Sequence, residues 1–162
     1  MSFSTDHVYG YGFEISFAGE DFDSKKFFDF LKNHSETIKS LYDGEKILKF
    51  IKAKNPDLDK FCEEFADRQG LEGGYNTARN IVADIMNKET GLRFSNQLDM
   101  NSDDEFVMLT ECMPWLLNEK ERNVTEKELN DICVKYMTEI GLPTEENFEG
   151  QLIGMQKVEY FG

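Results

Sequence analysis

The stretch VYGYGFEISF, residues 8–17, alternates strictly between large apolar side chains and small or polar ones. This period of two predicts a β-strand, because successive side chains of a strand point to opposite faces of a sheet. The apolar face, which a layer of helices must cover, carries Tyr9, Tyr11, Phe13, Ile15 and Phe17. The opposite face carries Gly10 and Gly12, whose missing side chains predict close approach by a neighbouring backbone or side chain.

Five further stretches carry apolar residues at helical spacing. They predict helices within residues 21–34, 36–54, 55–70, 76–91 and 124–143. The second stretch can divide into two helices at the Asp43-Gly44 pair, which favours a turn. The expected N-terminal caps are Asp23 or Ser24, Asp57, Asn76, and Thr125 in a capping box with Glu128. The expected C-terminal stops are Gly70, Gly91 and Gly141.

The remaining stretches predict a small sheet. Residues 92–98 and 105–110 are expected to form a hairpin around the acidic loop 99–104. Residues 113–123 are expected to form an irregular connector, and residues 152–162 an edge strand or a docked terminus. Together these elements predict an α+β fold, in which a single globular domain over residues 1–162 packs a small antiparallel sheet of about three or four strands against about five helices.

The net charge of −14 is unevenly distributed along the 162 residues. Residues 99–149 alone hold 14 acidic and four basic residues, a net charge of −10. A nucleic-acid-binding protein needs the opposite sign to neutralise phosphates, so direct binding of DNA, RNA or an anionic membrane is not expected. Acidity favours a cationic partner, or it serves solubility alone.

The sequence also predicts a cellular compartment. The first residues lack the basic and apolar regions of a signal peptide, and no run of apolar residues is long enough to span a membrane. Cys62, Cys112 and Cys133 show neither pairing nor metal spacing, which indicates reduced thiols. Cys62 and Cys133 fall on apolar helical faces and are expected in the core. A cytoplasmic protein is therefore expected.

The loop 99–104 partly matches the start of a calcium-binding EF-hand loop. Asp99, Asn101, Asp103 and Glu105 occupy its alternate positions, but Asp104 stands where the sharp turn needs glycine. An acidic hairpin tip is therefore expected here rather than a calcium site.

Other catalytic signatures are missing from the sequence. It shows no Cys and His spacing for zinc and no nucleophile motif. His34 ends a predicted helix, where partial positive charge suits the helix dipole. The prediction is a protein that is not an enzyme, with no catalytic residue, metal or cofactor. A metal-dependent enzyme stays open as an alternative, because active sites assemble from residues that are distant in sequence.

The stretch CMPWLLNEKE, residues 112–121, contains the only tryptophan and joins the hairpin to the last predicted helix. One interpretation is that Trp115 plugs the core between sheet and helix, together with Leu116 and Leu117. The other is that Trp115 is a surface anchor for a partner, because tryptophan is enriched among interface hot spots. A charged rim around that anchor would consist of Glu111, Glu119 and Glu121.

Several segments resemble small acidic proteins encoded by phages and prophages of Gram-positive bacteria. These segments are YGYGFEI, DEFVML, MPWLLNEKERNVTEKELNDICVKY and VEYFG. The resemblance implies a setting, namely a phage-encoded protein in the cytoplasm of an infected host. It implies no active site.

Charge and setting together predict a non-enzymatic inhibitor of a bacterial defence system, of the anti-CRISPR or anti-restriction type. It would bind a basic, nucleic-acid-binding surface of a host protein or nucleoprotein complex through an acidic face. The alternative is a phage accessory or interaction protein whose acidity serves solubility only. The residues expected to contact the partner are Asp99, Asp103, Asp104, Glu105, Glu111, Trp115, Glu119, Glu121, Glu126, Glu128 and Asp131.

Overall fold

A computed structural model describes residues 5–17, 22–53, 56–65, 75–100, 102, 104–110, 112–142 and 153–161. The predicted α+β class is confirmed. Within these residues, seven α-helices and a short 3-10 helix accompany one four-stranded antiparallel sheet.

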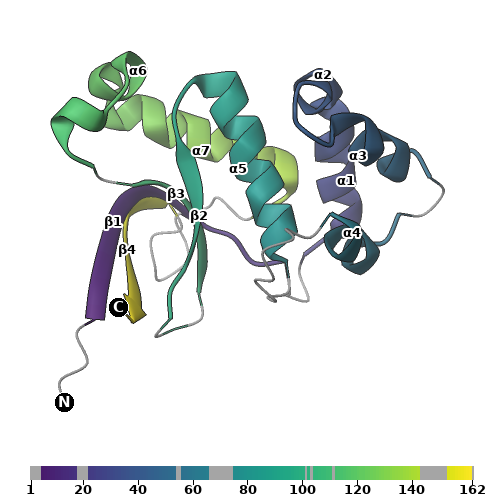
Figure 1. Cartoon of the computed structure of the whole chain (residues 1–162), viewed down its shortest axis with the longest axis horizontal. Helices are drawn as coiled ribbons and strands as arrows, with labels where there is room; N and C mark the ends of the chain where they lie inside the picture. The colour runs from purple at the N-terminus through teal and green to yellow at the C-terminus, as the bar shows by residue number, and fades with distance from the viewer. Residues whose placement is uncertain are drawn as a thin grey trace.

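The sheet has the strand order β2-β3-β1-β4 (Figure 1). Its strands are β1 (Thr5–Glu14), β2 (Phe94–Leu98), β3 (Glu105–Thr110) and β4 (Ile153–Phe161). The alternating stretch therefore forms the inner strand β1, which pairs with β3 on one side and β4 on the other. The predicted hairpin is β2–β3, and the last stretch of the chain is the edge strand β4.

The helices match most of the predicted stretches. They are α1 (Ser24–Asn33), α2 (Ser35–Lys39), α3 (Gly44–Ile51), α4 (Leu58–Glu64), α5 (Asn76–Thr90), α6 (Glu119–Asn123) and α7 (Glu126–Ile140). Asp23 and Asp57 cap α1 and α4, each accepting a backbone N–H at 3.0 Å. Gly91 and Gly141 end α5 and α7 in the left-handed conformation, with φ of 75° and 88°. Gly70 lies outside the described residues.

The predicted irregular connector is partly wrong. It contains the 3-10 helix η1 (Pro114–Leu116) and the short helix α6. A complete capping box, which needs a polar N-cap residue and a glutamate three positions later, starts α6 at Asn118 and Glu121. At α7, Thr125 accepts the N–H of Glu128 at 3.1 Å, which is half of the box predicted there.

The predicted cap of α5 is also wrong. Tyr75 is the N-cap residue and makes no side-chain cap hydrogen bond. Asn76 is already helical, and its side-chain oxygen accepts hydrogen bonds from Arg79 and Asn96 instead. Polar tertiary partners have therefore overridden the local capping preference of asparagine.

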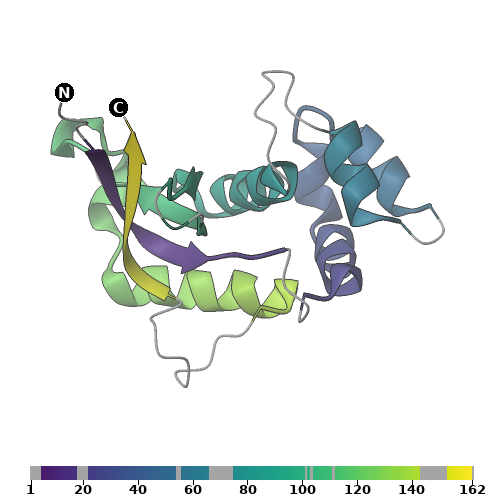
Figure 2. The same ribbon diagram turned by 90° about the horizontal axis from the view of Figure 1, so that it is seen from below.

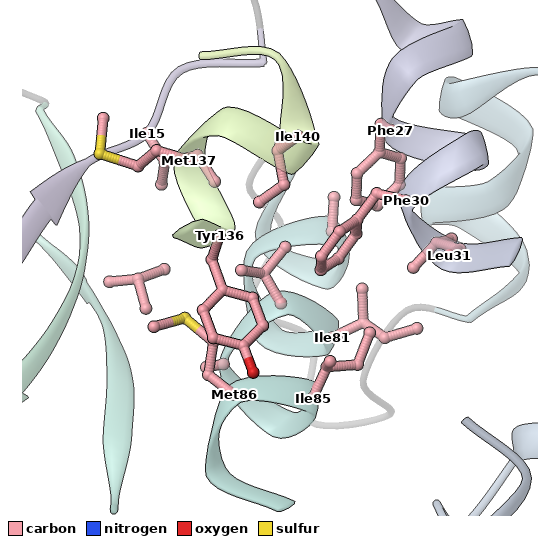
Figure 3. Packing of buried hydrophobic residues seen from close by; sticks show 14 of the residues in the cluster. Ile15, Phe27, Phe30, Leu31, Ile81, Ile85, Met86, Tyr136, Met137 and Ile140 are labelled. Carbon is pink, nitrogen blue, oxygen red and sulfur yellow. The ribbon is translucent and has the colours of Figure 1, made fainter. Parts of the chain in front are cut away.

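The main core begins between the sheet and the helices α5 and α7 and continues into α1–α4. α5 and α7 lie along one face of the sheet, as Figure 1 and Figure 2 show. The helices α1–α4 lie farther from the sheet, where α1 contacts α7 and both α2 and α4 contact α5. Figure 3 shows Tyr136 of α7 and Met86 of α5 packed together, with Phe30 of α1 beside them. The predicted apolar face is buried at Tyr11, Phe13, Ile15 and Phe17, whereas Tyr9 is exposed.

The glycines of β1 allow the predicted close approach of a neighbouring strand. A Cβ atom at Gly10 would lie 2.6 Å from the carbonyl oxygen of Leu109, and one at Gly12 would overlap the carbonyl of Val107. Only glycine fits such contacts with the backbone of β3.

The sheet curls around its other face. A second, smaller buried cluster lies there, made of Phe106, Met108 and Val158. Just past the end of β2, the N–H of Met100 donates to the carbonyl of Glu159 in β4 at 2.7 Å. At the start of β2, the Asn87 side chain accepts the N–H of Phe94 at 2.6 Å and donates to its carbonyl at 2.8 Å. The backbone groups that face outward at both ends of β2 therefore already have hydrogen-bond partners within the chain.

Candidate functional site

An ion pair fixes the place where β2 meets α6. Arg93 donates to one carboxylate oxygen of Glu121 from Nη2 at 2.6 Å and from Nε at 3.0 Å. The Glu121 side chain is 2% exposed and also accepts the backbone N–H groups of Arg93 and Asn118 at 3.1 and 3.0 Å. Burial alone would raise the pKa of Glu121, but these hydrogen bonds outweigh it and lower the pKa. The carboxylate of Glu121 is therefore paired with Arg93 and with two backbone N–H groups inside the fold, and it does not face a partner.

The same residues hold the segment that precedes α6. Arg93 Nη2 donates to the carbonyl of Leu116 at 2.6 Å. Asn118 accepts the N–H of Glu121 at 2.8 Å and donates to the carbonyl of Gly91 at 3.0 Å. Residues 112–116 are thereby tied at one end to β2 and to the end of α5.

This anchored segment displays apolar side chains to solvent. Trp115 is 75% exposed, Leu116 57% and Met113 56%, and Cys112 and Pro114 are exposed as well. We call residues 112–116 the Trp115 patch. The interpretation of Trp115 as a core plug is wrong, because its side chain is mostly exposed to solvent. The Arg93–Glu121 pair connects the sheet to α6 instead.

A groove lies close to the Arg93–Glu121 pair, between α6, α7 and the end of α5. Its volume is about 630 Å³. Leu92, Val124 and Ile132 supply its apolar lining, Glu119 and Glu128 its acidic groups, and Lys120 a basic group. Leu92 precedes Arg93 directly, and Arg93 bonds the carbonyl of Leu116, so the groove and the Trp115 patch both adjoin the Arg93–Glu121 pair.

The acidic residues expected to form one face are divided between two ends of the sheet. Figure 1 shows the β2–β3 turn and α6 at opposite ends. At the turn, Asp99 is buried and accepts the N–H of Ser102 at 3.1 Å, whereas Asp104 is exposed. Glu105 forms an ion pair at 2.6 Å with the buried Arg79. Asp103 and Glu111 lie outside the described residues.

The acidic residues at the other end are interspersed with basic ones. The exposed acidic residues of α6 and α7 are Glu119, Glu126, Glu128 and Asp131. The exposed basic residues of the same helices are Lys120, Arg122, Lys127 and Lys135. These helices therefore do not present the strongly negative face that the net charge of −10 over residues 99–149 suggested.

His34 makes a polar junction that the sequence did not predict. Its Nδ1 lies 2.7 Å from a carboxylate oxygen of Glu89 in α5, and its Nε2 lies 2.5 Å from one of Glu139 in α7. Glu89 also accepts hydrogen bonds from Thr37 at 2.5 Å and from Tyr136 at 2.6 Å. Burial would raise the pKa of Glu89, but the bonds from Thr37, Tyr136 and His34 outweigh it and lower the pKa.

The imidazole of His34 therefore joins three helices at one point. Carboxylates only accept hydrogen bonds, so both contacts form together when both ring nitrogens carry protons. The two ring nitrogens face different carboxylates, which is the geometry of a bridge and not of a chelated metal. The junction is a structural tie between α5, α7 and the start of α2.

Arg79 is a buried polar group that the sequence did not reveal. It lies in α5 among the core residues, and its Nε donates to Asn96 of β2 at 2.8 Å. Burial lowers the pKa of Arg79, and the ion pair with Glu105 opposes that shift. Arg79 thus links α5 to β2 and to the first residue of β3.

The cysteines are placed as their sequence positions predicted. Cys62 and Cys133 are buried, and burial raises the pKa of Cys133 to about 12, so its thiol stays protonated. Among the described ranges, no group of three or more His, Cys, Asp or Glu side chains is placed to hold a metal ion.

No helix in the described part of the chain is long and apolar enough to cross a bilayer. Comparisons of the chain with protein-family models, with curated proteins and with solved structures found no match.

Proposed function

We propose that this is a non-enzymatic binding protein that engages a partner protein through the Trp115 patch. The observation that carries the proposal is the 75% exposure of Trp115 on a segment anchored by the Arg93–Glu121 pair. An exposed tryptophan on an anchored backbone loses little conformational freedom when a partner covers it. Tryptophan side chains of this kind supply a large share of binding energy at protein interfaces.

The patch alone is too small to be a complete interface. A stable interface buries about 800 Å² on each partner, which a few exposed side chains do not reach. The groove near the patch extends the contact surface, and its apolar lining suits apolar side chains. Its two acidic residues, Glu119 and Glu128, outnumber its one basic residue, Lys120, which favours a basic side chain of the partner. The partner would supply a pocket for Trp115 and basic residues around it.

Charge has a different role in this proposal from the one the sequence suggested. The net charge of −14 would attract a basic partner from a distance and speed its association. The close contact would be made by the Trp115 patch, because the exposed acids of α6 and α7 are interspersed with bases. In the phage setting that the resemblance implies, the partner would be a basic protein or nucleoprotein complex of a host defence system, met in the host cytoplasm.

The test is an affinity pull-down from host lysate with matched variants. Met113→Ala removes a side chain of the patch that is 56% exposed, and Met155→Ala removes one on β4 that is 55% exposed. Trp115→Ala and Met113→Ala should lose the partner that the wild type retains, whereas Met155→Ala should keep it. Trp115→Ala should weaken binding by about 30-fold, as expected for a hot spot of about 2 kcal/mol.

Repeating the pull-down at high salt separates apolar contact from charge. Retention that survives about 1 M salt supports contact through the Trp115 patch, because exposed charges are screened over a few ångströms there. Binding that disappears with salt and is unchanged in Trp115→Ala would overturn the proposal in favour of a purely electrostatic contact. A partner lost equally from all three variants would point to a nonspecific apolar effect and would also overturn it.

A further inference from the structure

A separate cavity lies at the far end of the molecule from the Trp115 patch. It opens to solvent and is bordered by the turn between α2 and α3, by α3 itself, by α4 and by α5, and its volume is about 150 Å³. Figure 1 shows α2, α3 and α4 grouped away from the sheet, with α5 reaching from them to the sheet. Its apolar walls include Ile47, Phe61, Phe65 and Ile81. A cavity of this size holds a molecule of roughly the size of benzene.

Two carboxylates also line this cavity. Asp43 precedes α3 as its N-cap residue, yet its side chain makes no capping hydrogen bond, in contrast to Asp23 and Asp57. Asp84 lies on α5, and among the described residues the side chains of Asp43 and Asp84 take part in no hydrogen bond or ion pair. These two acids therefore border an apolar space without a cation to balance them.

The environment of Asp84 shows that its carboxylate is poorly compensated. Asp84 is an exposed residue at the rim of the cavity, and the partial burial of its carboxyl group raises its pKa. No neighbouring charge or hydrogen bond opposes this shift, unlike at Glu89 and Glu121, where hydrogen bonds lower the pKa despite burial. A cation placed in the cavity would supply the missing compensation.

We propose that this cavity binds a small organic ammonium ion. Its apolar body would contact Phe61, Phe65 and Ile47, and its ammonium group would face Asp84 and Asp43. An inorganic cation would gain nothing from the apolar walls, and a neutral hydrocarbon would leave both carboxylates uncompensated. An amine attached to a compact ring or short chain satisfies both features.

The test compares two probes of equal size, benzylammonium and benzyl alcohol. Amide chemical shifts would be followed by NMR during titration of the wild-type protein with each probe. Benzylammonium should cause saturable shifts at Thr77, Asn80 and Ile81, which line the cavity on α5. It should bind about tenfold more tightly than benzyl alcohol, since a single charge contact typically accounts for a factor of this order.

Charge-neutral variants distinguish the cavity from general electrostatic attraction. Asp84→Asn keeps the shape of the side chain and should reduce benzylammonium binding to the level of benzyl alcohol. Asp29→Asn removes an exposed acid on α1 and should leave both probes unaffected. Equal binding of the two probes, shifts located elsewhere, or an equal response of both variants would overturn the proposal. These outcomes leave the Trp115 patch untouched, so they are independent of the proposed function.

Discussion

Replacing Trp115 by alanine should reduce the stability of the fold only slightly. Because Trp115 is 75% exposed, about a quarter of its roughly 250 Å² is covered, which is about 60 Å². At roughly 25 cal/mol per Å² of buried apolar surface, the expected loss in unfolding free energy is about 1.5 kcal/mol. A tryptophan that plugs the core would lose about 3–5 kcal/mol on the same substitution.

Urea denaturation followed by far-ultraviolet circular dichroism measures this difference, because the variant has no tryptophan fluorescence. The melting temperature should fall by no more than about 6 °C for a chain of this length. Phe61→Ala is the contrasting variant, since Phe61 is fully buried and should lose about 3–5 kcal/mol. A loss of about 3 kcal/mol or more in Trp115→Ala would refute the exposed position of the indole.

Three further predictions concern the fold. Gly12→Ala should destabilise the protein by about 2 kcal/mol or more, because its Cβ would overlap the Val107 carbonyl; an unchanged urea midpoint would contradict this. His34→Ala should lower the unfolding free energy by about 2–3 kcal/mol in the same assay by removing hydrogen bonds to two carboxylates. The exposed His7 is its control and should change it by less than about 0.5 kcal/mol on the same substitution. Because the pKa of Glu89 is lowered in the fold, its contribution is fully present above its ordinary value of 4.5 and is lost as the pH falls through the folded value. Denaturation at a series of acidic pH values should therefore show a shallower acid slope for Glu89→Gln than for the wild type.

The sequence predicted those parts of the fold that depend on local pattern. Alternation at Tyr11 and Phe13 identified the inner strand, and Asp57 and Gly91 marked helix ends correctly. Each of these signals acts within a few residues, where steric fit and a single hydrogen bond decide the outcome. The helix α6 was missed although its capping pair, Asn118 and Glu121, is visible in the sequence. Its five residues are too few to show helical periodicity.

The contents of the candidate site could not be predicted in the same way. Glu121 was expected on an acidic surface, and its burial depends on Arg93, which is 28 residues away in sequence. Likewise His34 contacts Glu139 across 105 residues, and no local pattern encodes such a pair. Net charge sums over a segment, whereas a binding face depends on which charges share a direction. That distinction explains why the acidic residues of one segment lie at two separate ends of the sheet.

The contact between Asn87 and Phe94 also governs how the sheet meets other chains. Edge strands with free N–H and C=O groups recruit strands from neighbouring molecules and seed fibres. Here a side-chain amide takes the place of such a strand at Phe94, and Glu159 does so at Met100. Alternate residues of a strand direct their backbone groups to the same side, so Asn96 and Leu98 lie between two occupied positions. A foreign strand would have to displace an intramolecular partner at each end, which protects this edge from templated aggregation.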